Sequence, residues 1–579
     1  MISDFSTLLQ ELEPWLEVIN RPAGESLFSE GDPGDSCFFI DSGVVRVEQE
    51  SAEIDTEPVL GYFSSGDIVG ELALLDHGPR SASVVVEEDL VTWKLSESDL
   101  SEIGSSNPQL QAKVYRRLGA IAAGRLRYEK DSETVYDPDG EVNELVSAAN
   151  AAQKIFASWD SDKIQALLSR IAAVAAERAE EQAKLAVEVT HLGNVKDKTQ
   201  KNLMASLGVL ESLDGQAMGL ISRNTDTGVS IFGHPVGVVF ALVPQTNPVS
   251  TAVFKTLIAL KSRNALILSY HRSALPIAEE VGSMITEVLE EFGAPSGLVS
   301  WIKNRHSRRK TESFFRHQGV SLILATGGRS MVRAAYGSGR PAIGVGSGNT
   351  PVLICDDARL KRCAEQIVLS KSFDNGLICG AEHNLIVFDS IYDDFAQVLE
   401  ESGAAVLSEK ESDQLLKTLY SQTGQIRRHI VGQAAVDIAR EAGIERESRI
   451  NLIVVPVNKI SKEDPLCREK MAPVLSLFRC ANQEEGMDFC ERILGLDGAG
   501  HSAAIHSASK ETLDEFARRM PVGRILANTP AAHGVVGLTT GLVPSLTLGC
   551  GTFGGTSTTD NVTYTHLMNI KRLAEGNES

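Results

Sequence analysis

Short apolar runs alternate with amphipathic helical patterns through the middle of this 579-residue chain. The apolar runs occupy residues 233–244, 264–270, 298–302 and 321–326, and the helical patterns occupy residues 249–262 and 272–292. Apolar runs without polar alternation are typical of strands covered on both faces, and such strands are usually parallel and joined by helices. The pattern therefore predicts a parallel α/β sheet with helices packed on it.

One of these apolar runs leads into a glycine pair at the start of a helical pattern. The run SLILAT (321–326) is followed by Gly327 and Gly328, and then by RSMVRAAYGSG. A strand, two glycines and a helix form a place where a pyrophosphate can rest on a helix N-terminus. The GxGxxG spacing is absent, so a glycine turn needed only for tight packing fits this segment equally well.

Length and charge limit the classes of function. A chain of 579 residues is too long for one core, so we expect two or three domains. The formal charge of −22 argues against a general surface for nucleic acid or anionic membrane, although a local basic pocket stays open. No apolar run reaches membrane-spanning length, and the acidic N-terminal stretch lacks the basic region of a signal peptide, so we expect a cytoplasmic protein. The eight cysteines show no CxxC or zinc spacing, and we expect no structural disulfide and no metal.

The N-terminal part of the chain has a different pattern from the strand–helix alternation of the middle. From Arg21 to Leu95, short strand-like runs are separated by glycines, which predicts a small antiparallel roll or barrel. The segment GELALLDHGPRSASVVV (70–86) then places Glu71 nine residues before Arg80, across a short helix-like stretch. A guanidinium and free backbone N–H groups suit a phosphate, and a carboxylate in the same pocket suits a ribose hydroxyl.

This segment closely resembles the phosphate-binding cassette of cyclic nucleotide-binding domains. The upstream pattern GDxGDxxFFIxSGxVRV resembles the roll of the same family. The resemblance implies that Glu71 binds the ribose 2′-hydroxyl, that Arg80 binds the cyclic phosphate, and that the backbone of Gly70 and Ala73 helps cradle the ligand. Ser81 could serve the phosphate or a syn guanine, so cAMP and cGMP both stay open. The alternative is a degenerate roll in which Glu71 and Arg80 form a plain salt bridge.

The boundary of this first domain is set by helices and an acidic stretch. Residues 105–127 have helical periodicity, and residues 128–142 (YEKDSETVYDPDGEV) read as a turn-rich linker. No basic recognition helix follows the roll. We therefore divide the chain into a domain at 1–127, a linker at 128–142 and a remainder at 143–579, which opens with two or three amphipathic helices.

A cysteine among small and turn-forming residues marks the remainder. The stretch SKSFDNGLICGAEHN (370–384) carries Cys379 between Asn375-Gly376 and Gly380. A thiol in such a setting has its backbone open to a substrate and is a candidate nucleophile. The alternative is a small buried hydrophobic residue, which is what most free cysteines are.

The remainder of the chain resembles the aldehyde dehydrogenase superfamily, and most closely its CoA-acylating branch. The matching segments occur in the order of that family: PQTNP, NALILSYH, ATGG, AIGVGSGNTP, SKSFDNGLICGAE, EKMAP, GAGHSAAIH and PSLTLGCGTFGG. The resemblance covers about 435 residues. It implies a Rossmann-like NAD domain at about 143–345 with C-terminal parts, and an α/β catalytic domain at about 346–545.

The resemblance also implies a catalytic set. Cys379 would attack the aldehyde to give a thiohemiacetal, and hydride transfer would leave a thioester on its sulfur. The Asn247 side-chain amide and the Cys379 backbone N–H would donate hydrogen bonds to the oxyanion. His501 matches a characteristic histidine of the acylating branch, and could deprotonate the CoA thiol or help position the cofactor; a purely structural histidine is the alternative.

The cofactor residues follow from the same resemblance. Gly327 and Gly328 would back the NAD pyrophosphate, and Glu469 of EKMAP would hold the nicotinamide ribose. Pro244 and Thr326 are further expected cofactor contacts. Ser269-Tyr270-His271 stands where the family usually has a lysine, so NAD and NADP both stay open.

The fate of the thioester separates two branches of the family. Hydrolytic members carry a glutamate general base, and the matching segment AIGVGSGN (342–349) contains no acid. Without a base to activate water, the thioester is left for a thiol, which favours CoA as the acceptor.

These features predict an NAD-dependent, CoA-acylating aldehyde dehydrogenase that is regulated by a cyclic nucleotide. Acetaldehyde, propionaldehyde, succinate semialdehyde and sulfoacetaldehyde stay open as substrates, and we expect a homodimer or homotetramer. One alternative is a cyclic-nucleotide sensor with a catalytically retired scaffold, and another is a hydrolytic dehydrogenase or a reductase of acyl phosphates.

Overall fold

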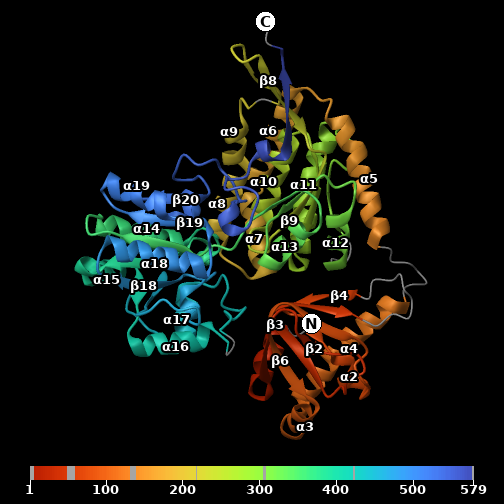
Figure 1. Cartoon of the computed structure of the whole chain (residues 1–579), viewed down its shortest axis with the longest axis vertical. Helices are drawn as coiled ribbons and strands as arrows, with labels where there is room; N and C mark the ends of the chain where they lie inside the picture. The colour runs from red at the N-terminus through yellow and green to blue at the C-terminus, as the bar shows by residue number, and fades with distance from the viewer. Residues whose placement is uncertain are drawn as a thin grey trace. The chain divides into compact units, whose positions relative to one another are not determined.

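The structure is a computed structural model that describes residues 5–48, 59–130, 138–216, 218–303, 308–421 and 424–576 (Figure 1). It separates into two compact units. The first contains Met1–Gly140 and Tyr420–His429, and the second contains Glu141–Leu419 and Ile430–Ser579. No helix in the described part of the chain combines the length and the apolar composition needed to cross a bilayer.

The first unit is an antiparallel roll followed by helices, as the glycine-punctuated strands predict. Its main sheet runs in the order β1-β6-β3-β4, with β2 beside β6 and β5 beside β3. The strands are β1 Glu17–Arg21, β2 Ser26–Phe28, β3 Ser36–Glu48, β4 Val59–Ser64, β5 Ile68–Val69 and β6 Ser83–Ser96. The helices are α1 Phe5–Leu12, α2 Glu71–Asp76, α3 Glu97–Ser106 and α4 Pro108–Lys130.

Helices extend into both ends of the stretch that we predict as a linker, 128–142. Helix α4 continues through Lys130, and helix α5 (Pro138–Phe156) begins before the predicted end of the linker. Residues 131–137, the centre of the predicted linker, lie outside the described residues. Tyr420–His429, which falls within the predicted remainder 143–579, groups with the first unit.

The second unit contains two parallel sheets, as the alternation of strands and helices predicts. The first parallel sheet has the order β11-β10-β9-β12-β13. Its strands are β9 Val238–Val243, β10 Ala265–Tyr270, β11 Val299–Trp301, β12 Leu322–Ala325 and β13 Ala342–Gly344. The helices of this region are α6 Ser161–Glu177, α7 Ala179–Thr190, α8 Val195–Leu203, α9 Val209–Leu213, α10 Pro248–Lys261, α11 Leu275–Glu291, α12 Arg308–Arg316 and α13 Arg329–Gly337.

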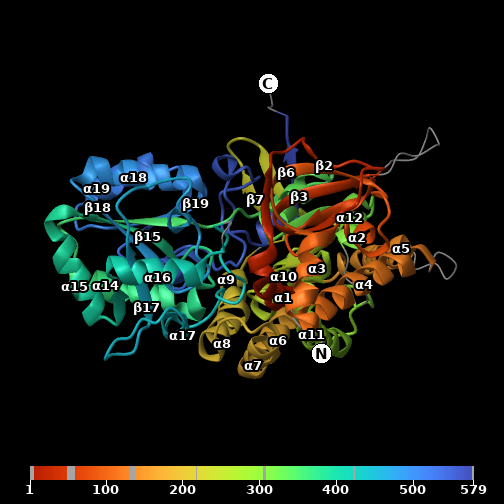
Figure 2. The same ribbon diagram turned by 90° about the horizontal axis from the view of Figure 1, so that it is seen from below.

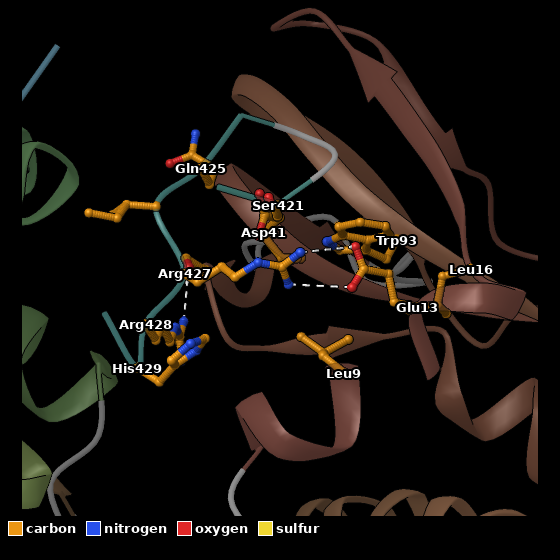
Figure 3. Close-up of a pocket in the computed structure, with 13 residues that line it drawn as sticks. Leu9, Glu13, Leu16, Asp41, Trp93, Ser421, Gln425, Arg427, Arg428 and His429 are labelled. Atoms are coloured by element: carbon orange, nitrogen blue, oxygen red, sulfur yellow. Dashed lines mark hydrogen bonds and ion pairs between the residues drawn. The ribbon is translucent and has the colours of Figure 1, made fainter. Parts of the chain in front are cut away.

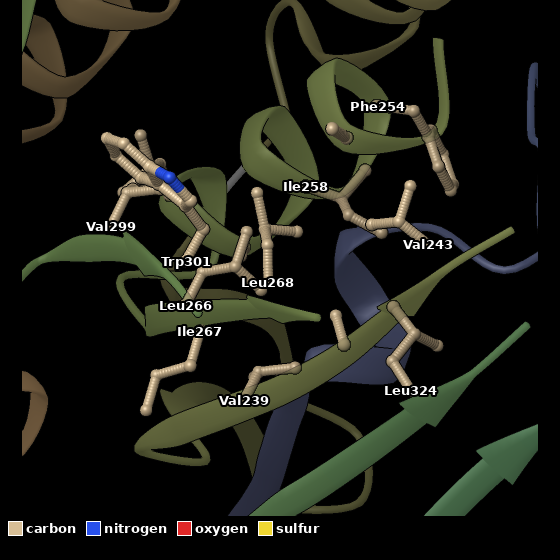
Figure 4. Packing of buried hydrophobic residues seen from close by; sticks show 14 of the residues in the cluster. Val239, Val243, Phe254, Ile258, Leu266, Ile267, Leu268, Val299, Trp301 and Leu324 are labelled. Carbon is tan, nitrogen blue, oxygen red and sulfur yellow. The ribbon is translucent and has the colours of Figure 1, made fainter. Parts of the chain in front are cut away.

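The core of this region forms where α10 packs on the first parallel sheet. Figure 4 shows Ile258 of α10 beside Val243 of β9, with Leu268 of β10 close by. All three are buried in one continuous cluster. Every residue of β9 and β10 is buried, because helices cover both faces of a parallel sheet.

The predicted strand at residues 233–244 is in fact two strands. Strand β8 (Val229–Pro235) ends at Pro235, and β9 starts at Val238. Gly237 between them has a φ of +125°, a conformation that residues with side chains rarely adopt. Strand β8 lies outside the parallel sheet and pairs with β7 (Gly219–Asn224) and β21 (Met568–Ala574).

The second parallel sheet has the order β16-β17-β18-β15-β14-β19-β20. Its strands are β14 Thr350–Ile354, β15 Glu382–Phe388, β16 Ala404–Val406, β17 Leu452–Pro456, β18 Val474–Cys480, β19 Gly500–His506 and β20 Val522–Ala527. Helices α18 (Gln483–Leu496) and α19 (Lys510–Arg519) cover one face, and α14 (Leu360–Ser372) and α15 (Tyr392–Glu401) cover the other (Figure 2). The remaining helices are α16 Glu409–Leu419, α17 Ala435–Glu441 and α20 Ala531–Val535.

The two parallel sheets are joined by a very short connection. Strand β13 ends at Gly344 and β14 begins at Thr350. The carboxyl end of the first sheet and the amino end of the second are therefore close to each other at residues 345–349. The predicted division near residue 345 falls in this connection.

Candidate functional site

Cys379 follows a tightly turned segment and stands just before β15. In the turn, Asp374 and Asn375 have φ values of 46° and 55°, a left-handed conformation that Asp and Asn tolerate better than most residues. The turn is held from outside, because Asn375 Nδ2 donates to the Gly432 carbonyl over 2.8 Å. The FDNG turn that precedes the thiol is thus tied to a distant segment of the chain.

The thiol of Cys379 is partly exposed, whereas every other cysteine is buried; all eight lie within the described residues. Its surroundings raise its pKa to about 12, first through burial and then through the negative charge of Glu469. The positive charge of Arg524 and the cysteine's own backbone N–H act in the opposite direction. In the free protein the thiol is therefore protonated at neutral pH.

The acid-free segment 342–349 lies directly against this cysteine. A Cβ built on Gly348 would be 2.7 Å from the Cys379 carbonyl carbon and would overlap its oxygen. Thr350 Oγ1 also donates to the carbonyl of Gly380 over 3.3 Å. The backbone next to the nucleophile is thus in contact with the segment in which hydrolytic relatives would carry a general base.

Asn247 lies between the end of β9 and the start of α10, and its side chain makes no capping hydrogen bond to the helix. Its Oδ1 accepts a hydrogen bond from Lys201 Nζ at 2.7 Å, and its Nδ2 donates to Thr246 Oγ1 at 3.2 Å. An ammonium group only donates, so this contact fixes which end of the carboxamide is the oxygen. One Nδ2 hydrogen is left for a ligand.

His501 lies on β19 and is fully buried. Burial and the charge of Arg524 lower its pKa to about 3, so the ring is neutral. Nδ1 pairs with Ser502 Oγ at 2.8 Å, and Nε2 has no hydrogen-bond partner within the described part of the chain. The ring can offer a hydrogen-bonding nitrogen to a ligand but is a weak base.

Four of the five predicted cofactor residues gather at the carboxyl edge of the first parallel sheet. The strand order reverses between β9 and β12, and ligands bind at such a switch point in open α/β sheets. Pro244 follows β9 directly, and the run from Thr326 to Gly328 follows β12. A Cβ at Gly328 would meet open space, and Gly328 precedes α13 without a side-chain cap. The open backbone at a helix start fits a pyrophosphate.

A buried lysine connects these two strand ends. Lys255 Nζ donates to the Leu242 carbonyl at 2.5 Å and to Thr326 Oγ1 at 3.0 Å. Burial lowers its pKa to about 7. Its side chain therefore fixes the orientation of Thr326 beside the proposed cofactor position.

Two of the three predicted catalytic residues, Cys379 and His501, lie at the amino edge of the second parallel sheet, together with the predicted cofactor residue Glu469. Cys379 precedes β15, Glu469 precedes β18, and His501 is the second residue of β19. Glu469 is close enough to Cys379 for its charge to raise the pKa of the thiol. Asn247 instead belongs to the carboxyl edge of the first sheet, and the short connection 345–349 lies between the two edges.

Four buried charged residues at this site were not found from the sequence. Each of them is buried and makes a hydrogen bond to a predicted site residue or to a neighbour of one. They are Lys201, Lys255, Asp374 and Arg524. The spacing of Lys198 and Lys201 puts both on one helix face, and this is the sequence feature that could have indicated a shared partner. Lysines are usually solvent-exposed, so this spacing does not by itself predict burial.

The environment of Cys379 predicts the pH dependence of its reactivity. Because only the thiolate is alkylated, modification of Cys379 by iodoacetamide should rise about tenfold per pH unit between pH 7 and pH 9. Replacing Glu469 by Gln removes a charge that raises the thiol pKa, so alkylation at pH 8 should become faster. Peptide mass spectrometry would follow the modification, with Cys379→Ala as the blank. A rate that levels off below pH 8 would contradict the raised pKa.

In the first unit, Arg80 is 4% exposed and lies inside the roll. Its Nη1 donates to the Ser36 carbonyl at 2.6 Å, and its guanidinium carbon lies 4.2 Å from the centre of the Phe28 ring. Its Nε has no hydrogen-bond partner among the described residues, and the Asp35 carboxylate is 3.9 Å away at the surface. A buried guanidinium with an unused N–H fits an anionic ligand.

The other predicted nucleotide-binding residues surround Arg80. Glu71 and Ala73 are buried in α2, and Ser81 is exposed. Gly70 has a φ of 78°, and a Cβ there would be 2.6 Å from Arg80 Nη1, so only glycine lets the backbone approach the guanidinium. The cassette thus places the buried Glu71 and Arg80 in one small region of the roll, and their roles toward a nucleotide stay predictions.

The first unit also contains a separate cavity of about 90 Å³ (Figure 3). Leu9, Leu16 and Trp93 supply apolar walls. Arg427 Nη1 crosses it to the Glu13 carboxylate at 3.3 Å. Arg428 donates to Ser65 Oγ at 2.9 Å, which explains why Tyr420–His429 groups with this unit.

Family models match both parts of the chain. The model for the cyclic nucleotide-binding domain matches residues 18–107, and the model for the aldehyde dehydrogenase family matches residues 134–566. The first match covers the roll with Glu71 and Arg80, and the second covers both parallel sheets with Cys379.

Individual relatives agree with the second match. The bifunctional aldehyde-alcohol dehydrogenase AdhE of Escherichia coli K12 is 36% identical over 445 residues, which are 76% of this chain and 50% of that protein. This chain thus spans about half the length of the curated relatives it matches first. The succinate-semialdehyde dehydrogenase (acetylating) of Clostridium kluyveri is 31% identical over 76% of this chain and 96% of its own.

A solved structure is similar over the same region. An acetylating aldehyde dehydrogenase from Geobacillus thermoglucosidasius is 38% identical, with a TM-score of 0.74, over 77% of this chain and 99% of its own. The sheets, the thiol loop and these matches lead to one assignment: the chain belongs to the aldehyde dehydrogenase family and carries a cyclic nucleotide-binding domain at its N-terminal side.

Proposed function

We propose that this protein oxidises a short aldehyde to an acyl-CoA, with NAD or NADP as the oxidant and Cys379 as the nucleophile. The observation that carries the proposal is the contact between Gly348 and the Cys379 backbone. It brings the acid-free segment 342–349 against the backbone of the nucleophile, in the region where hydrolysis would require a water-activating base. Two similar proteins have "acetylating" in their names, which supports transfer of the acyl group.

The first step needs a thiolate and a stabilised oxyanion. Cys379 loses its proton to water and forms a bond from its sulfur to the aldehyde carbon, so that the carbonyl oxygen becomes an alkoxide. The unused N–H of Asn247 and the backbone N–H of Cys379 are the donors proposed for that oxygen. Such donors act strongly because they are fixed before the charge develops.

The cofactor residues hold the oxidant next to this adduct. Gly327 and Gly328 would face its pyrophosphate, and Glu469 would hold its nicotinamide ribose. When bound, the nicotinamide ring supplies the acceptor for the hydride that leaves the adduct carbon, which converts the adduct into a thioester on Cys379.

Transfer of the acyl group completes the cycle. The CoA sulfur attacks the thioester carbon, and Cys379 leaves as a thiolate. His501 has a pKa of about 3, which supports a hydrogen-bonding role toward a ligand more than a role as base for the CoA thiol. Its unpartnered Nε2 is the atom that would make this bond.

The deciding experiment is NADH or NADPH formation from acetaldehyde, propionaldehyde, succinate semialdehyde and sulfoacetaldehyde, with and without CoA. Acyl-CoA and reduced cofactor should form together and only when CoA is present. Reduced cofactor without CoA would indicate a hydrolytic enzyme, and a requirement for phosphate in place of CoA would indicate acyl-phosphate chemistry. No turnover with any aldehyde would favour a sensor with a retired scaffold.

We further propose that the cyclic nucleotide-binding domain binds cAMP or cGMP and thereby regulates the dehydrogenase. The buried Arg80 with its unused Nε supports the binding half. The chain path supports the regulatory half, because the chain enters the first unit again at Tyr420–His429 within the dehydrogenase sequence. A ligand can regulate only through unequal affinity for two states, so saturating nucleotide must change kcat or KM.

Replacing Arg80 by Lys should weaken binding of the cyclic nucleotide by about 10- to 100-fold, because lysine cannot donate two parallel hydrogen bonds to a phosphate. Isothermal titration calorimetry with cAMP and cGMP would measure the change. The matched control is Arg46→Lys, a half-buried arginine of the same roll that pairs with Glu87 at 2.6 Å. Equal affinity in both variants and in the unaltered protein would refute the site, and unchanged kinetics at saturating nucleotide would refute the regulation.

A further inference from the structure

Lys201 links the two halves of the proposed catalytic site. It lies on α8 and is 2% exposed. Its Nζ donates to Asn247 Oδ1 at 2.7 Å and forms a very short ion pair with Asp374 Oδ2. Asn247 belongs to the edge of the first parallel sheet, and Asp374 belongs to the turn that supports Cys379. One ammonium group therefore holds both segments.

The contact with Asn247 determines which way the carboxamide faces. An amide of this kind can exchange its oxygen and nitrogen ends by rotating half a turn, and the two orientations have almost the same shape. With a lysine ammonium on one side, only the oxygen can face it. The NH₂ group then faces away from α8, with one hydrogen on Thr246 Oγ1 and the other free for a ligand.

The contact with Asp374 fixes the turn before the nucleophile. Asp374 is fully buried, and its two oxygens accept from Lys201, from Lys198 Nζ at 3.0 Å and from the Asn194 backbone N–H at 2.9 Å. Lys198 also donates to the Thr246 carbonyl at 2.8 Å, but it makes no hydrogen bond to the Asn247 side chain. The two lysines thus share one carboxylate and differ in their second partner.

From this geometry we propose that Lys201 is a positioning residue that orients the Asn247 amide toward the oxyanion and ties it to the Cys379 turn. The proposal rests on the function given above, in which Asn247 donates to the alkoxide. Lys201 itself does not touch the reacting atoms. It sets the donor in place before the charge develops, which is the condition under which an oxyanion donor is effective.

The test compares Lys201→Met with Lys198→Met in the full-length protein. Both changes remove a buried ammonium from Asp374, so they should lower thermal stability to a similar extent. Lys201→Met alone frees the carboxamide to turn, so its kcat should fall by about 10- to 100-fold, at an almost unchanged KM for the nicotinamide cofactor. The kcat of Lys198→Met should fall by no more than about threefold.

The rate of Cys379 alkylation distinguishes two causes of a lower kcat: loss of the Asn247 orientation and a general disturbance of the turn that carries Cys379. Reaction with iodoacetamide forms no oxyanion, so its rate at pH 8 should be nearly the same in Lys201→Met and in Lys198→Met. A double-mutant cycle adds a second criterion. If Lys201 acts through Asn247, the change Lys201→Met should cost little further kcat once Asn247 is already Ala.

Each outcome decides the inference. Equal kcat in the two lysine variants would overturn it, and so would full additivity with Asn247→Ala or a parallel loss of alkylation and turnover in Lys201→Met. If Lys201→Met does not fold, Lys201→Gln replaces it. Its amide can still donate to Asn247, so its kcat should be higher than that of Asn247→Ala. Equal kcat values in Lys201→Gln and Asn247→Ala would overturn the inference. Absence of turnover in the unaltered protein would instead refute the proposed function.

Discussion

Replacing Cys379 by Ala should abolish CoA-dependent formation of reduced cofactor, with a loss of about 10⁴-fold or more. Without the sulfur no adduct forms, and hydride transfer from a free or hydrated aldehyde has no comparable path. The protein should still fold and bind NADH, because the alanine keeps the backbone of the turn and removes one partly exposed atom. Fluorescence titration with NADH would confirm this.

Alanine variants of two other cysteines test whether Cys379 is the nucleophile. Cys490 lies on α18 and is buried in the apolar cluster that this helix forms with the second parallel sheet, so Cys490→Ala should retain most of the activity. Cys550 is the competing candidate, because its sulfur accepts the Gly346 backbone N–H at 3.2 Å within the same region. If turnover is lost in Cys550→Ala and kept in Cys379→Ala, the nucleophile has been wrongly assigned.

The parallel sheets could be predicted from the sequence because their signal is local. Strand β10 and helix α10 lie within one residue of the runs NALILSY and VSTAVFKTLIALKS. The break at Gly237 could not be predicted in the same way, because β8 pairs with β21, more than 300 residues later. A pairing between distant segments leaves no periodic trace near either of them.

Some residues of the candidate site could likewise be predicted from local sequence, and others could not. Cys379, Asn247 and Arg80 lie in segments whose order and spacing resemble known families, so their roles could be proposed from the sequence. Lys201 could not, because its importance depends on a buried contact with Asp374, 173 residues away. A lysine in a polar helical pattern is ordinarily solvent-exposed. Only the fold shows that this one meets a carboxylate and a carboxamide.

The packing of Gly348 against Cys379 implies a second large effect, that of Gly348→Ala. The added Cβ would overlap the Cys379 carbonyl oxygen and lie 2.7 Å from its carbon. These are backbone atoms, which cannot rotate away as a flexible side chain can, so the turn that carries the thiol must move. A misplacement of about 1 Å in an active site can cost about 100-fold in rate, and overpacking costs about 1–3 kcal/mol of stability.

The matched control is Gly495→Ala. Gly495 lies in α18, and a Cβ there would meet no atom within 4 Å. Alanine is favoured over glycine within a helix by about 1 kcal/mol, so this variant should be slightly more stable and fully active. Thermal unfolding and CoA-dependent turnover would be measured on both variants. If Gly348→Ala kept the activity of the unaltered protein, the close contact between the acid-free segment and the nucleophile could not be present in solution, and the structural basis for CoA as the acceptor would be lost with it.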